Sequence, residues 1–198
     1  LVNRIIGRRD AIVEERPGVT RDRKVVEAEW AGREFTLVDT GGWMTAGDSL
    51  DVKVSRQAEK AMQESDLILF VVDATTGITA DDAAVAELLR RAKPPVLVVA
   101  NKVDSEQREP DIWDFVRLGL GDPFPVSALH GRASGDLLDE VIGRLPPAAS
   151  SMSGEPEGGG AVVGAAIHEK AAVNSVAIVG RPNVGKSTLF NRLIGDDR

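Results

Sequence analysis

The stretch Gly180-Arg181-Pro182-Asn183-Val184-Gly185-Lys186-Ser187-Thr188 fits the phosphate-loop pattern G-x-x-x-x-G-K-[ST]. An apolar run rich in β-branched residues precedes it at 173–179, which predicts a buried parallel strand, and a segment with helical apolar spacing follows it. The backbone N–H groups of such a loop and the helix N-terminus bind phosphate. We expect Lys186 to reach the β- and γ-phosphates as a catalytic residue and the Ser187 hydroxyl to ligate Mg²⁺. The alternative, a glycine turn that only joins a strand to a helix, does not explain why both flanks fit the motif.

The segment that follows this loop occurs twice in the chain. Leu189-Phe-Asn-Arg-Leu-Ile-Gly195 resembles Leu1-Val-Asn-Arg-Ile-Ile-Gly7 at an offset of 188 residues (189 − 1). We therefore interpret the chain as parts of two tandem nucleotide-binding domains, of which the first lacks its first strand and its phosphate loop. The predicted boundaries are 1–145 for the first domain, 146–172 for a flexible linker rich in Pro, Gly and Ser, and 173–198 for the start of the second domain.

Strands and helices alternate through the first of these parts. Short runs of strand-forming residues predict strands at 24–30, 34–39, 67–72, 96–100 and 124–127, of which the first two form a β-hairpin. Apolar residues at helical spacing predict helices at 51–65, 79–91, 109–118 and 135–145, with Thr79 as an N-cap. This order predicts an α/β fold with a mostly parallel sheet covered by helices on both faces.

Composition narrows the class of protein. The 198-residue chain has a formal net charge of −7, which gives no overall attraction to nucleic acid. It has no cysteine, which excludes disulfides and thiolate metal sites. No apolar run approaches the roughly 20 residues that a membrane helix needs, so we expect no membrane partner.

Asn101-Lys102-Val103-Asp104 follows the predicted strand 96–100 and matches the N-K-x-D motif that reads guanine. The Asp104 carboxylate is suited to accept hydrogen bonds from N1–H and the exocyclic amine of guanine, whereas adenine presents a lone pair at N1. Such a mismatch is strongly disfavoured because it leaves buried polar groups unpaired. We expect the Lys102 stem to cover the base and Asn101 to tie neighbouring loops together. A solvated turn is the alternative interpretation of these four residues.

Three weaker motifs occur in the order expected for the same site. Asp39-Thr40-Gly41-Gly42 ends the strand 34–39 and matches D-x-x-G, in which the aspartate holds Mg²⁺ and the last glycine N–H meets the γ-phosphate. Thr20, in P-G-V-T-R-D at 17–22, is expected to hold Mg²⁺ and to respond to the γ-phosphate. The N–H groups of Ser127-Ala128-Leu129 are expected to bind guanine O6. Each motif taken alone has a simpler alternative, which is an Asp-Gly turn for 39–42 and a plain loop for each of the other two.

Together these residues resemble the translation-factor class of P-loop GTPases and, more closely, the EngA/Der family of bacterial GTPases with two tandem G domains. The likeness rests on the segments 17–22, 39–42, 101–104, 127–132 and 180–195. It implies a cytoplasmic GTPase that uses GTP, GDP and Mg²⁺ and acts in assembly of the large ribosomal subunit, with that subunit or its rRNA as partner. Trp43 stands where Ras-like proteins have a water-orienting glutamine. In relatives an asparagine of the phosphate loop, here Asn183, helps to hold K⁺; since Asn183 belongs to the expected second domain, this role does not carry over to the first.

The motif order, with the phosphate loop last, is that of a circularly permuted G domain. We hypothesise that residues 174–195 fill the vacant place in the first domain's sheet, either within one chain as a monomer or by strand exchange in an oligomer. The linker can extend to about 90 Å at ~3.3 Å per residue, which is long enough. In the competing interpretation, Leu1–Gly7 occupies that place. The functional alternatives are a nucleotide-dependent ribosome-binding scaffold with negligible hydrolysis, an ATP-using enzyme, and an inactive split site.

Overall fold

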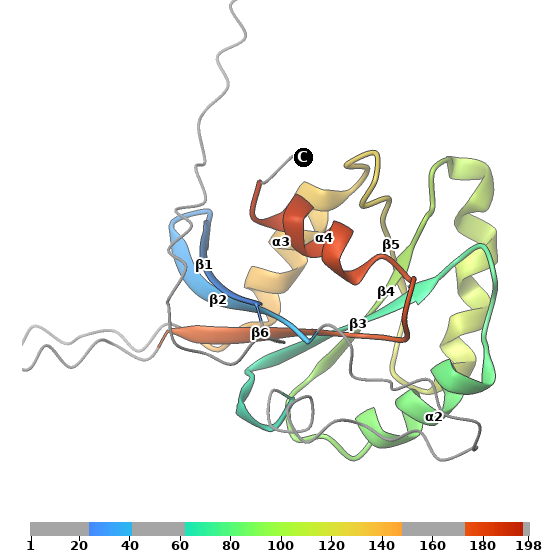
Figure 1. Cartoon of the computed structure of the whole chain (residues 1–198), viewed down its shortest axis with the longest axis horizontal. Coiled ribbons are helices and arrows are strands. Elements are labelled where there is room, and N and C mark those ends of the chain that lie inside the picture. The colour runs from blue at the N-terminus through green and yellow to red at the C-terminus, as the bar shows by residue number, and fades with distance from the viewer. Residues whose placement is uncertain (1–23, 41–61, 148–172, 196–198) are drawn as a thin grey trace, which may run out of the picture.

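The computed structural model describes residues 24–40, 62–147 and 173–195, with elements labelled as in Figure 1. The strands are β1 (Lys24–Trp30), β2 (Arg33–Asp39), β3 (Leu67–Asp73), β4 (Val96–Asn101), β5 (Phe124–Pro125) and β6 (Asn174–Val179). The helices are α2 (Ala80–Leu89), the 3-10 helix η1 (Glu106–Leu118), α3 (Ser134–Arg144) and α4 (Lys186–Leu193). Over the described ranges, no helix is long and apolar enough to cross a bilayer.

The strands form one six-stranded sheet in the order β1-β2-β6-β3-β4-β5. Only β1 and β2 pair antiparallel, and every other pair of neighbours is parallel. Strand β6 comes from the C-terminal segment, and its Ala177 pairs with Val38 on one side and with Ile68 on the other (Figure 1). The segment 174–179 therefore fills the place between β2 and β3 in this sheet, as hypothesised from the motif order. The competing segment Leu1–Gly7 lies outside the described residues.

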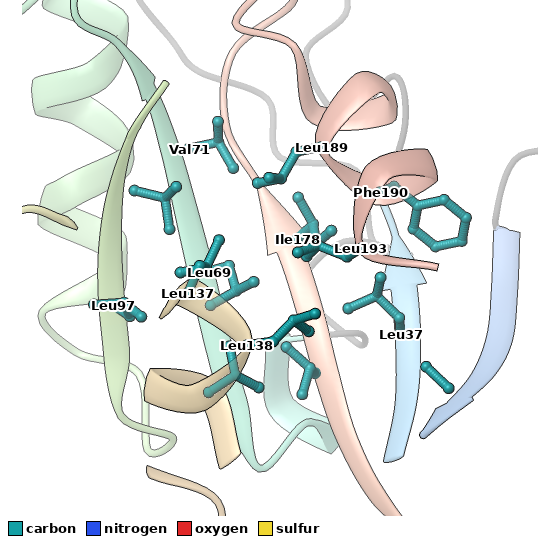
Figure 2. Close-up of a cluster of buried hydrophobic side chains, with 14 of the residues drawn as sticks. Leu37, Leu69, Val71, Leu97, Leu137, Leu138, Ile178, Leu189, Phe190 and Leu193 are labelled. Atoms are coloured by element: carbon teal, nitrogen blue, oxygen red, sulfur yellow. The ribbon is translucent and has the colours of Figure 1, made fainter. Parts of the chain in front are cut away.

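Two hydrophobic cores cover the two faces of this sheet. Strand β3 is buried at all seven positions, as expected for a strand with helices on both faces. Its side chains alternate, so that Leu69 faces the core under α3 and α4, whereas Phe70 faces the core under α2 and η1. Figure 2 shows the first core, with Leu137 of α3 and Leu189 of α4 on the same side of the sheet. The predicted α/β fold with a mostly parallel sheet is confirmed.

Some elements differ from the prediction in type or extent. The helix expected at 109–118 is the longer 3-10 helix η1, which contains Pro110; proline lacks the N–H that an α-helix uses in its interior. Strand β5 is shorter than the expected 124–127, and Ser127 instead forms an isolated bridge with Arg132. Of the helix predicted at 51–65, only 62–65 are described, and of these 62–64 are helical. Thr79 caps α2 as predicted, since its hydroxyl accepts a hydrogen bond from Asp82 N at 3.2 Å.

Candidate nucleotide-binding site

The predicted motifs meet at one edge of the sheet. Asp39 is the last residue of β2, Asp73 of β3 and Asn101 of β4, and the phosphate loop begins at Gly180, directly after β6. Because these four strands are parallel, their carboxyl ends lie at the same edge. Segments that are distant in sequence thereby come into contact at the place where open α/β sheets bind ligands.

The phosphate loop adopts backbone conformations that favour glycine at two positions. Gly180 and Gly185 have φ angles of +152° and +94°, and Asn183 between them has +64°. A Cβ at Gly180 would lie 2.3 Å from the backbone oxygen of Val71, so glycine lets the loop pass this close to β3. Helix α4 begins at Lys186, at the end of the loop. A helix N-terminus preceded by such a loop is an arrangement that binds phosphate.

Lys186 is poised to bind an anion. It is 7% exposed, and its Nζ donates a hydrogen bond to the backbone oxygen of Arg181 at 2.9 Å. Burial lowers the pKa of Lys186, the Asp39 carboxylate opposes this shift, and the Arg181 guanidinium adds to it, so that the pKa lies below its ordinary value. A buried ammonium gains from an additional negative charge nearby. A phosphate group at this loop would supply that charge.

Ser187 and Asp39 present two oxygen ligands side by side. The Ser187 hydroxyl donates to Asp39 Oδ2 at 2.9 Å, although the two residues are 148 positions apart in sequence. The other carboxylate oxygen, Asp39 Oδ1, is buried and has no hydrogen-bond partner. A buried carboxylate oxygen needs a partner, and hydroxyl and carboxylate oxygens are ligands that Mg²⁺ takes together with water. The two side chains therefore fit the predicted Mg²⁺ site. A different kind of metal site, built from three or more His, Cys, Asp or Glu side chains, does not occur within the described ranges.

Asn101 connects three loops. Its Nδ2 donates to the backbone oxygen of Val184 in the phosphate loop at 2.8 Å, and its Oδ1 accepts from the N–H of Ala128 at 3.0 Å. The side chain lies so close to the phosphate loop that a Cβ at Gly185 would be 2.4 Å from Nδ2. The predicted role of Asn101 as a tie between loops agrees with this geometry.

Lys102 reaches toward the phosphate loop across the same edge. Its Nζ donates to Asp73 Oδ2 at 2.5 Å and to the backbone oxygen of Asn183 at 3.1 Å. Burial alone would raise the pKa of Asp73, but hydrogen bonds from Lys102 and Thr75 outweigh it, so the pKa is lowered. Asp73 therefore stays ionised and holds the Lys102 head group, which leaves the alkyl stem to lie along the site.

The Asp104 carboxylate is half exposed, with 48% of its side chain accessible, and Oδ1 accepts from the Ser127 hydroxyl at 2.7 Å. It is therefore open to a base while its orientation is fixed from the neighbouring loop.

Val103 and Val184 have no exposed surface and belong to the hydrophobic cores, so they anchor their motifs. Thr40 is also buried, and its hydroxyl donates to the backbone oxygen of Ile178 at 2.6 Å. The exposed residues of the phosphate loop are Pro182, Asn183, Ser187 and Thr188.

Sequence analysis missed two contacts of Arg181. Its Nη2 donates to the Thr76 hydroxyl at 2.6 Å, and its Nε lies 3.5 Å from Asp82 Oδ2. Asp82 lies in the first turn of α2 and has no exposed surface. Its burial and its ion pair fix the first residue after Gly180 against the start of α2. No local pattern signals a contact between residues so far apart in sequence.

Four predicted site residues cannot be placed against this geometry. Thr20 and the segment Gly41-Gly42-Trp43 lie outside the described residues. Their expected contacts with Mg²⁺ and the γ-phosphate remain predictions.

Comparisons with known proteins agree with the fold and the motifs. The profile of the family described as "50S ribosome-binding GTPase" matches residues 1–102 and 175–198. The chain is 51% identical over 198 residues to the GTPase Der of Streptomyces coelicolor and 52% identical over 199 residues to that of Moorella thermoacetica. All of this chain is covered in both comparisons, against 40% and 42% of those proteins, so the chain spans about two fifths of their length. The predicted likeness to the EngA/Der family is confirmed.

Among solved structures, the crystal structure of YjeQ from Thermotoga maritima is similar at a TM-score of 0.44 and 15% identity. The similarity covers 92% of this chain and 63% of that one. The family match is the stronger finding, because it extends over β1 to β4, over β6 from its second residue, and over the phosphate loop. The chain belongs to the 50S ribosome-binding GTPase family.

Proposed function

We propose that this chain binds GDP and GTP with Mg²⁺ and hydrolyses GTP. The observation that carries the proposal is the pair of hydrogen bonds made by Asn101, to Val184 O at 2.8 Å and from Ala128 N at 3.0 Å. These bonds join a phosphate loop to the two loops whose sequences read guanine. A structural turn that only happened to match N-K-x-D would have no reason to hold these partners.

Each group in the site has a defined task in this proposal. The Asp104 carboxylate accepts hydrogen bonds from N1–H and the amine of guanine, which excludes adenine. The phosphate-loop N–H groups and Lys186 bind the β- and γ-phosphates, where they stabilise charge that develops in phosphoryl transfer. Ser187 and Asp39 hold Mg²⁺, which neutralises phosphate charge when bound. The N–H of Gly42 and the hydroxyl and N–H of Thr20 complete the γ-phosphate end.

Two further assignments rest on sequence likeness. Asn183, on the exposed side of the phosphate loop, is proposed to help hold K⁺. Trp43 replaces the water-orienting glutamine of Ras-like proteins, so the attacking water is oriented by another group. We also propose that residues 1–145 are a first G domain, 146–172 a linker, and 173–198 the start of a second G domain that here serves the sheet of the first.

The setting that fits this activity is ribosome assembly in the cytoplasm, with the large ribosomal subunit or its rRNA as partner. The family description and the relatives named GTPase Der support this proposal. Co-sedimentation of the protein with purified large subunits, in GDP and in a non-hydrolysable GTP analogue, tests it. Binding that does not depend on nucleotide, or no binding at all, would contradict the proposed switch.

Titration of the full chain with GDP in Mg²⁺ tests the nucleotide site itself, with ADP as competitor and Lys186→Ala as the site variant. We expect selective GDP binding that the substitution abolishes. Equal affinity for ADP, or binding that survives Lys186→Ala, would contradict the proposal. Phosphate release from GTP then separates the enzyme from the alternative of a ribosome-binding scaffold, in which GTP binds without turnover.

A further inference from the structure

Arg192 forms two hydrogen bonds with the loop 127–129, whose N–H groups were predicted to bind guanine O6. It lies in the last turn of α4, the helix that begins at Lys186. Its Nε donates to the backbone oxygen of Ala128 at 3.0 Å, and its Nη2 donates to that of Leu129 at 2.9 Å. The guanidinium also lies 3.5 Å from the position that a Cβ would take at Gly131. One side chain therefore holds two consecutive carbonyl groups, which suits the fixed fork of donors in arginine.

These two hydrogen bonds fix the directions of two amide N–H groups. A trans peptide unit is planar, so its C=O and its N–H point in opposite directions. A donor that holds the carbonyl of Ala128 therefore sets the direction of the N–H of Leu129, which points away from the guanidinium. The hydrogen bond to the carbonyl of Leu129 likewise sets the N–H of His130, which donates to the Ser127 hydroxyl at 3.3 Å.

The same loop is also held by Asn101, whose Oδ1 accepts the N–H of Ala128 at 3.0 Å. Both anchors lead to the phosphate loop, because Asn101 also binds Val184 O and Arg192 shares α4 with Lys186. Helix α4 has eight residues and is about 12 Å long at ~1.5 Å per residue. A single short helix thus presents the phosphate-binding lysine near one end and the anchor of the base-reading loop near the other.

We infer that Arg192 is a positioning residue for guanine recognition: it orients the N–H of Leu129 toward the place of O6, without touching the base. The inference rests on the guanine site proposed above. An arginine at the end of a helix is ordinarily explained as a partner of the helix dipole. Its two carbonyl partners in the loop 127–129 give it a more specific task here.

The test compares nucleotides that differ at O6 in the full chain. GDP and inosine diphosphate share O6, whereas 6-thio-GDP carries sulfur there, which is a weaker hydrogen-bond acceptor. We expect Arg192→Met to weaken GDP and inosine diphosphate about fivefold to tenfold, the effect of about one hydrogen bond. The affinity for 6-thio-GDP should change less than about twofold, because it gains little from that N–H in the unsubstituted chain. Arg144→Met is the matched control, since Arg144 pairs with Glu140 on the surface of α3.

The outcomes separate this inference from the proposed function. If Arg192→Met lowers the affinity for GDP and for 6-thio-GDP equally, Arg192 is merely structural. If the unsubstituted chain binds both nucleotides with equal affinity, the loop does not read O6. Either result overturns this inference and leaves the proposed function standing. Absence of GDP binding by the unsubstituted chain would overturn the proposed function with it. Thermal unfolding checks each variant, and Arg192→Lys, which keeps the charge and loses the fork, takes the same comparison if Arg192→Met does not fold.

Discussion

Replacing Asn101 by alanine tests whether one buried side chain holds the nucleotide-binding loops together. Asn101 is 3% exposed, and its two partners, Val184 and Ala128, are 0% and 1% exposed. The substitution leaves a buried carbonyl and a buried N–H without this partner, and each such group costs about 1–3 kcal/mol. We therefore expect the free energy of unfolding to fall by about 2–6 kcal/mol.

Urea unfolding of the nucleotide-free full chain, followed by circular dichroism, measures this difference. The matched control is Asn174→Ala, which makes the same truncation in β6 and removes an exposed hydrogen bond to Pro146 O at 2.9 Å. The control should lose less than about 0.5 kcal/mol, as is usual for surface positions.

A second variant, Asn101→Asp, isolates the bond to the phosphate loop. It keeps the oxygen that accepts from Ala128 N, but it sets a carboxylate oxygen against the Val184 carbonyl in place of the N–H donor. The variant should therefore be destabilised at least as much as a single lost buried hydrogen bond, about 1–3 kcal/mol. A loss below about 1 kcal/mol in Asn101→Ala, or one equal to that of Asn174→Ala, would refute the reasoning.

Three other predictions concern the phosphate loop and its support. The pKa of Lys186 in the folded chain lies below the ordinary 10.5, so between the folded and the unfolded pKa the unfolded chain binds more protons. The free energy of unfolding, measured by urea titration, should therefore rise with pH across this window in the unsubstituted chain relative to Lys186→Met. Asp82→Ala leaves Arg181 without its buried partner and should cost about 3 kcal/mol in thermal unfolding, whereas the exposed neighbour Asp81→Ala should cost little. Gly180→Ala places a Cβ 2.3 Å from Val71 O and should cost about 3 kcal/mol or more, whereas Gly143→Ala in α3, where nothing lies within 4 Å, should be neutral or stabilising.

Local patterns in the sequence predicted most of the fold. The predicted strands 67–72 and 96–100 end within one residue of β3 and β4, because an uninterrupted apolar run needs burial on both faces. Thr79 was recognised as an N-cap because a hydroxyl before a helical pattern satisfies a free N–H. The predicted strand ends placed Asp39 and Asn101 at the carboxyl ends of their strands, as the structure has them. In open α/β sheets this is the edge where ligands bind, so it indicated the place of the site.

Contacts that depend on tertiary packing could not be predicted in this way. Arg181 binds Thr76 across 105 positions, and Arg192 binds Ala128 across 64 positions. Neither partner belongs to a pattern that requires an arginine, so only the assembled tertiary structure brings them together. The 3-10 form of η1 was missed for a local reason, because apolar spacing does not separate 3-10 from α-helix around a proline.

The position of β6 links the stability of the sheet to the formation of the site. Its last four residues are buried, and it pairs with β2 on one side and β3 on the other, so its apolar side chains are covered only when both neighbours are in place. The phosphate loop starts where this strand ends. Thr40, directly after β2, donates a hydrogen bond to Ile178 O of β6, and Asn101, at the end of β4, donates one to Val184 O of the loop. The arrangement that buries β6 therefore also places Ser187 beside Asp39. A ligand that binds the assembled loop stabilises the central strand as well, because it binds only the folded arrangement.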